Sequence, residues 1–255
     1  MELKIGETLP KFKDLMSLLK AINEEMTLKF SPEKIMAASM DPSHVVMVMM
    51  EIDKNLFQDY QAKEDETLTV NLKELSQFLD RIGKDESVAM KKDEEKMRLV
   101  ITAAKGGHRR RFELPLLDTI EDTVPDPKIF FKAQTKILTK AFDSAIKDSI
   151  LVAEHATISI VNEFEKGAVF RIAGNGDLGD AVNEFEKGDD NIIEIKLEED
   201  SSATYTLSYL EQVMGPIGRL YDVIKIELAK DMPMKILGEG PDPHKSTIYL
   251  APCII

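Results

Sequence analysis

The sequence predicts an α+β chain of two similar halves, because helical and strand-like patterns recur twice in the same order. In each half an amphipathic helical stretch comes first, and a second one precedes the last three strands. Short runs of alternating apolar residues account for most of the remainder. At 255 residues, the chain is long enough for two domains of ordinary size. We expect a first domain over residues 1–117, a connector over 118–128 and a second domain over 129–255.

The first half is expected to open with a helix over Leu9–Ile22, where apolar residues recur every three or four positions and Thr8 can act as the cap. The second helix should span Leu72–Ile82, with Asn71 as its cap. Turns are expected over Lys91–Glu95 and at Gly106. The strands are expected at Thr27–Phe30, Ile35–Ser39, Val45–Ile52, Ser87–Met90, Met97–Thr102 and Arg110–Leu116.

The second half repeats this order, with helices expected over Ile137–Leu151 and Tyr209–Leu220. Two glycines and Pro216 interrupt the last of these, which predicts a weak, short helix. The strands are expected at Thr157–Val161, Val169–Ala173, Ile192–Leu197, Val223–Leu228, Pro233–Leu237 and Thr247–Leu250.

One heptapeptide, Val-Asn-Glu-Phe-Glu-Lys-Gly, occurs unchanged at Val161–Gly167 and Val182–Gly188. Both copies are interpreted as a strand end followed by a turn, since Lys-Gly suits a hairpin. Two copies do not make a solenoid, so the repeat is either incidental local duplication or a functional element.

The formal net charge is −13 and the pI is near 4.9, which on average argues against nucleic-acid binding. A basic stripe on one surface can nevertheless coexist with an acidic remainder. The sequence contains no metal-binding spacing, no phosphate-binding loop and no catalytic triad motif, so no catalytic residue, metal or cofactor is expected. Cys253, the single cysteine, rules out an intrachain disulfide and favours a reducing compartment. No apolar run is long enough to span a membrane, and the start lacks a signal-peptide pattern.

Five short blocks resemble the sliding clamps of the proliferating cell nuclear antigen (PCNA) family, in the order that the family uses. They are Ser39–Val45, Val70–Leu72, Leu114–Asp118, Asp231–Met234 and Tyr249–Pro252. The resemblance covers essentially the whole chain, and the leucine-proline form of the third block resembles archaeal members. It implies two similar domains of the DNA clamp fold, with helices lining a central channel and antiparallel sheets outside, and three subunits closed into a ring.

The resemblance also implies a DNA channel lined by basic residues on or beside the four helices. Gln77 and Asp80 occupy positions where the family usually has lysine, so this channel is less basic than in some relatives. Lys136, Lys140 and Lys147 are expected on one helical face. Taken singly, each lysine is better explained as part of an ordinary solvated helix face, and only the resemblance favours a channel. The channel residues are Lys11, Lys13, Lys20, Lys73, Arg81, Lys84, Lys136, Lys140, Lys147 and Arg219.

A second site implied by the resemblance is a pocket for the short apolar and aromatic peptides of client enzymes. Its lining combines methionine, proline and aromatic side chains, which can accommodate varied peptides. For Met40 and Val45, plain core packing is the alternative, and His44 is alternatively a surface histidine. The pocket residues are Met40, His44, Val45, Ile120, Val124, Pro125, Pro233, Tyr249, Ala251 and Pro252.

The third implied site is the subunit contact, in which the last strand of the first domain pairs with a strand edge in the neighbour. Arg109, Arg110 and Arg111 lie on the first strand, and Asp177 and Asp180 lie in the opposing region over 174–186, together with Glu184 and Glu186. Opposite charge would set orientation and association rate. The arginine triplet is alternatively a small anion-binding patch.

The expected function is therefore a non-enzymatic processivity factor of DNA replication and repair. It would encircle double-stranded DNA without sequence specificity and tether DNA polymerase, flap endonuclease and DNA ligase through PCNA-interacting peptides, after opening by a clamp loader. The expected location is the cytoplasm of an archaeon, at the nucleoid, or the nucleus if the source is eukaryotic. A ring of three identical chains and a ring mixed with paralogues both remain open. An acidic interaction scaffold without DNA is the alternative.

Overall fold

The computed structural model describes residues 1–62, 64–119, 124, 127–238 and 240–253. The chain forms two compact units. The first comprises Met1–Pro42, Val48–Val124 and Gly240–Ser246, and the second comprises Ser43–Met47, Pro125–Glu239 and Thr247–Ile255. The domain limits expected from the sequence remain a prediction.

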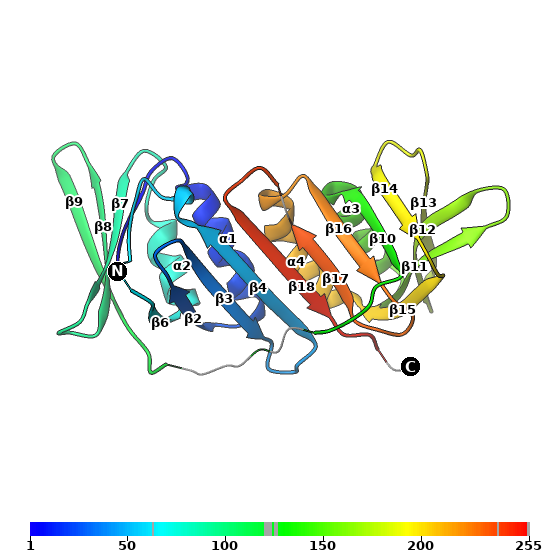
Figure 1. The fold of residues 1–255 in the computed structure, drawn as a ribbon, viewed down its shortest axis with the longest axis horizontal. Coiled ribbons are helices and arrows are strands. Elements are labelled where there is room, and N and C mark those ends of the chain that lie inside the picture. The colour runs from blue at the N-terminus through cyan, green and yellow to red at the C-terminus, as the bar shows by residue number, and fades with distance from the viewer. Residues whose placement is uncertain (63, 120–123, 125–126, 239, 254–255) are drawn as a thin grey trace. The chain divides into compact units, whose positions relative to one another are not determined.

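The first half of the chain runs strand, helix, five strands, helix, three strands (Figure 1). Its elements are β1 (Glu2–Ile5), α1 (Leu9–Ile22), β2 (Glu25–Phe30), β3 (Lys34–Met40), β4 (Val46–Asp53), the 3-10 turn η1 (Lys54–Leu56), β5 (Asp59–Gln61), β6 (Glu66–Asn71), α2 (Leu72–Asp80), β7 (Ser87–Asp93), β8 (Arg98–Lys105) and β9 (His108–Pro115).

The second half repeats that order. Its elements are β10 (Ala133–Leu138), α3 (Thr139–Ile150), β11 (His155–Glu163), β12 (Gly167–Gly176), β13 (Gly179–Glu186), β14 (Ile192–Leu197), β15 (Ser201–Thr206), α4 (Leu207–Leu220), β16 (Val223–Leu228), β17 (Met234–Gly238) and β18 (His244–Leu250).

The sheets confirm the duplication strand by strand. The order β5-β1-β7-β8-β9 in the first half matches β14-β10-β16-β17-β18 in the second. The order β4-β3-β2-β6 likewise matches β13-β12-β11-β15. Every strand thus has a counterpart at the same place in its half. The β1–β7, β8–β9, β11–β12 and β12–β13 pairings are antiparallel. The predicted α+β class is confirmed.

Each unit buries the apolar face of a helix pair. In α1 the buried residues include Phe12, Leu15 and Leu19, which follow the three- and four-residue spacing of the sequence. Asn71 caps α2 as predicted, because its Oδ1 accepts a hydrogen bond from Glu74 N at 3.0 Å. α1 contacts α2, and α3 contacts α4.

Several predictions of local structure were wrong. Thr8 does not cap α1, since its hydroxyl donates to Leu56 O at 2.6 Å instead. Each half opens with a strand rather than a helix, and Ile137 belongs to β10. The last helix, α4, has 14 residues, as many as α1, although Pro216 lies inside it. Its apolar face buries six large side chains and Pro216, and this packing outweighs the poor propensity of glycine and proline.

Gly176, at the end of β12, lies against the backbone of Val152 and Ala153. A Cβ built there would be 1.9 Å from Val152 O, a separation that real atoms do not reach. This close approach fixes where the β12–β13 hairpin begins relative to the end of α3.

We expect Gly176→Ala to lower the free energy of unfolding by about 1–3 kcal/mol, because the new methyl group would force the hairpin away from Val152. Thermal unfolding followed by circular dichroism measures the change. Gly107→Ala is the control, since a Cβ at Gly107 meets nothing within 4 Å. Equal midpoints for the two variants would contradict this account of Gly176.

Candidate functional site

In the first unit, the three lysines of α1 differ in the ion pairs and hydrogen bonds that they form within the chain. Lys11 Nζ lies 2.5 Å from Asp242 Oδ2, and this contact lowers the pKa of the Asp242 carboxyl. Lys13 Nζ donates to Ile82 O at 2.8 Å. Lys20 forms no ion pair with any residue that the structure describes. Lys20 is therefore the α1 lysine with its charge most available to an external anion.

The basic residues near α2 are exposed and weakly held. Lys73 lies 3.7 Å from Glu24, and both side chains are more than half exposed. Arg81 and Lys84 follow the helix rather than lie within it, and both are exposed. The exposed Asp80 ends α2, so this helix offers less positive charge than α1.

In the second unit, one predicted placement on a helix was wrong. Lys136 belongs to β10, where its backbone lies opposite Lys225 of β16 and Glu194 of β14 in the strand register. It therefore does not share a helical face with Lys140 and Lys147. Lys140 is exposed on α3. Lys147 pairs with Asp143 at 2.6 Å. On α4, the Arg219 guanidinium donates to Gly215 O at 3.1 Å.

Charge is distributed unevenly between the helices and the rest of the chain. The four helices contain seven basic and six acidic residues, whereas the whole chain has 33 basic and 46 acidic residues. The negative excess therefore lies outside the helices. Such a distribution leaves the helices able to lie near phosphates while the other surfaces stay acidic.

Several of the predicted pocket residues lie together in the second unit. Ala251 N donates to Val45 O at 2.9 Å, which holds the 43–47 segment beside the end of β18. The Tyr249 ring is 6% exposed, and Lys235 Nζ lies 5.7 Å from its centre. His44 is exposed, with a φ of 58°.

The remaining pocket residues are less well placed by the structure. Pro233 and Pro252 are half-buried in the second unit, and Met40 and Val124 are half-buried in the first. Ile120 and Pro125 lie outside the described residues. Pro252 also borders a cavity of about 620 Å³ that sequence reasoning did not anticipate, lined by Val161, Asp200, Ser201, Ser202, Ala203, Thr204, Lys230, Asp231 and Cys253.

The predicted subunit-contact residues lie on two strands that end their sheets. β9 is the last strand of β5-β1-β7-β8-β9, and β13 is the last of β13-β12-β11-β15. Arg110 forms an ion pair within its own chain, because its guanidinium lies 2.5 Å from Glu86 Oε2. Arg109 and Arg111 are exposed. Asp177 and Asp180 are exposed at the β12–β13 turn.

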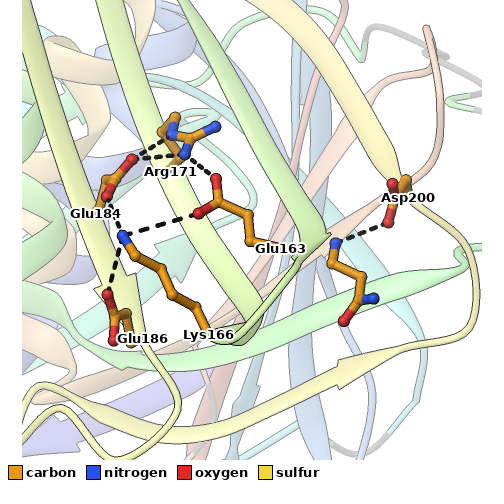
Figure 2. A network of polar contacts seen from close by, with 7 residues as sticks. Glu163, Lys166, Arg171, Glu184, Glu186 and Asp200 are labelled. Atoms are coloured by element: carbon orange, nitrogen blue, oxygen red, sulfur yellow. Dashed lines mark hydrogen bonds and ion pairs between the residues drawn. The ribbon is translucent and has the colours of Figure 1, made fainter.

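Glu184 and Glu186, also expected to face a neighbour, are bound within the chain (Figure 2). The Arg171 guanidinium of β12 donates to Glu184 Oε1 at 2.8 Å and also binds Glu163. Lys166 Nζ lies 3.1 Å from both Glu184 and Glu186. We call these five residues the β11–β13 charge cluster. Sequence reasoning missed it, although the repeated heptapeptide supplies four of its members.

The cluster changes the titration of its own members. The hydrogen bond from Arg171, followed by that from Lys166, lowers the pKa of Glu184 below its usual value near 4.5. The same contacts raise the pKa of Lys166 and of Arg171. Glu184, Lys166 and Arg171 are therefore held in their charged forms at neutral pH.

Comparison with known proteins decides the family. Residues 1–124 match the family described as proliferating cell nuclear antigen, N-terminal domain. A DNA polymerase sliding clamp of Methanococcus vannielii is 30% identical over 246 residues, which cover 95% of each chain. Another, from Thermococcus fumicolans, is 29% identical over 243 residues, 95% of this chain and 94% of that one.

The chain belongs to the PCNA family of DNA polymerase sliding clamps. The fold agrees, since the structure of PCNA from Thermococcus kodakaraensis matches with a TM-score of 0.88 at 20% identity and covers 99% of both chains. The PCNA2–PCNA3 complex from Sulfolobus tokodaii gives 0.85 at 21% identity, over 99% of each chain. PCNA-family proteins are processivity factors and not enzymes, so the expected lack of catalytic activity is confirmed by family membership.

Among the described residues, no group of three or more His, Cys, Asp or Glu side chains could hold a metal ion. None of the helices over those same residues has the length and apolar character needed to cross a membrane.

We expect Glu184→Gln to change how stability depends on pH. Because the folded pKa of Glu184 is lowered, its contribution is present above the ordinary value near 4.5 and is lost as pH falls through the lowered pKa. The unfolding midpoint of the natural chain should therefore exceed that of the variant at pH 7, and the difference should shrink as the pH falls below the ordinary value near 4.5. Glu165→Gln is the control, since Glu165 forms no ion pair with the described residues. A constant difference across this range would contradict the role of Glu184.

Proposed function

We propose that this chain is a DNA sliding clamp in which three subunits close into a ring around duplex DNA and hold a polymerase on its template. The observation that carries the proposal is the strand-by-strand duplication, together with family membership. Two halves with the same strand order supply repeated helix pairs, and the ring would present these pairs to the duplex. Retention then depends on topology and needs little adhesion.

The charge distribution supports this proposal. Helices with nearly balanced charge would contact phosphates weakly, which allows sliding, whereas a strongly basic channel would increase salt-dependent retention. The acidic remainder of the chain would repel DNA from the outer surfaces. Polymerase, flap endonuclease and ligase are the proposed clients, and a separate clamp loader would open the ring.

The deciding experiment uses a polymerase on primed circular DNA, with and without this protein and a clamp loader. Long products after a single binding event should require both. If the protein clamps by encirclement, cutting the circle should release it, because a ring slides off a free end. Retention on the linear DNA would contradict the proposal.

The double variant Lys20→Glu, Lys140→Glu should shorten the lifetime of the loaded clamp on circular DNA by about threefold or more in moderate salt, because each change repels phosphate. The matched control is Lys29→Glu, Lys187→Glu, which makes the same charge change at exposed positions outside the helices. Lifetimes are measured by fluorescence of labelled protein on tethered circles. An equal loss in both variants would show that net charge, rather than the helices, governs retention.

Met40→Ala should weaken binding of a client peptide by about tenfold, because it removes an apolar side chain from the proposed pocket. Met36→Ala is the control, since Met36 is an exposed methionine of the same strand, β3. Fluorescence anisotropy of a labelled peptide gives both dissociation constants. If Met36→Ala weakens binding as much as Met40→Ala, the pocket assignment is wrong.

A further inference from the structure

The repeated heptapeptide places two equivalent glutamates around one arginine. Glu163 is the third residue of the first copy and Glu184 is the third residue of the second, and both bind Arg171. Arg171 lies on β12, between the two strands that carry the copies. Figure 2 shows the two carboxylates converging on the guanidinium. The duplication therefore builds a charge cluster across three adjacent strands.

The β11–β13 charge cluster is not balanced. It has three carboxylates, from Glu163, Glu184 and Glu186, and only two cations. Its outermost members lie on β13, a strand that ends its sheet. A negative charge is thus left at an edge whose backbone is open to another strand.

The edge strand β9 carries the opposite imbalance. Arg98 and Arg111 share a single carboxylate, Glu113, at 3.1 and 2.9 Å. Arg109 lies two residues before Arg111 and pairs with no described acidic residue. β9 therefore has an excess of positive charge on one face.

Apolar packing fixes which faces would meet if β9 of one copy added to β13 of another. On β9, Phe112 points towards α2, where it stacks on Phe78 at 5.2 Å, so Arg109 and Arg111 lie on the opposite face. On β13, Phe185 stacks on Phe170, which in turn stacks on Phe142 of α3, so Glu184 and Glu186 lie away from that helix.

A continuous apolar layer across the new pair requires both phenylalanine faces to lie on the same side. Arg109 and Arg111 of one copy must then share a face with Glu184 and Glu186 of the next.

We infer that Arg109 and Arg111 of one subunit complete the β11–β13 charge cluster of its neighbour, forming one ion-pair network over four strands, and that this network favours pairing between copies of the same chain. The inference rests on the proposed ring. Leu178 and Val182, 84% and 54% exposed on or beside β13, would be covered by the same contact.

A charge exchange tests the inference. Arg111→Glu and Glu186→Arg, made singly, should each raise the concentration at which the assembly dissociates by at least about tenfold, and the double variant should return to within about threefold of the natural chain. Sedimentation equilibrium over a dilution series in low and high salt gives these values. Lys187→Glu is the control, since Lys187 follows β13 but lies outside the cluster. Circular dichroism of each variant checks that the subunit is folded.

The outcomes separate this inference from the proposed function. Singles that assemble like the natural chain, or a double variant no better than the singles, would overturn the shared network. If the natural chain still raised polymerase processivity, the clamp function would stand. A natural chain that stays monomeric at every concentration would overturn the network and self-closure together.

Discussion

Burial of a pair of amphipathic helices in each unit is the constraint on which the other surfaces depend. Once Phe12 and Leu15 of α1, and Phe142 and Ile146 of α3, face the core, the polar sides of all four helices must face outward. The same packing orients the strands, because Phe112 and Phe185 must join the helix side of their sheets. The charged faces of β9 and β13 follow from this alternation.

The sequence was most informative where apolar periodicity was strong. α1 was predicted to its terminal residues, and β14 and β16 were likewise located without error. β13 was anticipated only as a strand end before the turn at Gly188, and its start was not located, because its exposed face is polar. β10 was read as the start of a helix because Ile137 and Leu138 precede a helical pattern directly. In α4, tertiary burial outweighed the propensity of Gly215 and Pro216.

The functional residues were predictable to different degrees. Short motifs placed the family, and with it the expected channel and pocket, although spacing alone wrongly put Lys136 on a helix. The β11–β13 charge cluster was beyond sequence reasoning, because ion pairs across strands depend on register. Identical heptapeptides also lead to different burial: Phe164 is 94% exposed in a turn, whereas Phe185 is 8% exposed on the inner face of β13. Local sequence sets the strand ends, and neighbouring strands decide what is buried.

Two open strand edges of opposite charge on one chain affect how long an assembly of such chains holds its subunits. In any linear row of subunits joined head to tail, one bare β9 and one bare β13 remain, however long the row becomes. Only a closed circle leaves none. Releasing a subunit from the circle means breaking two joints, whereas opening it means breaking one. The same architecture can therefore admit a duplex quickly and still keep its subunits together for much longer.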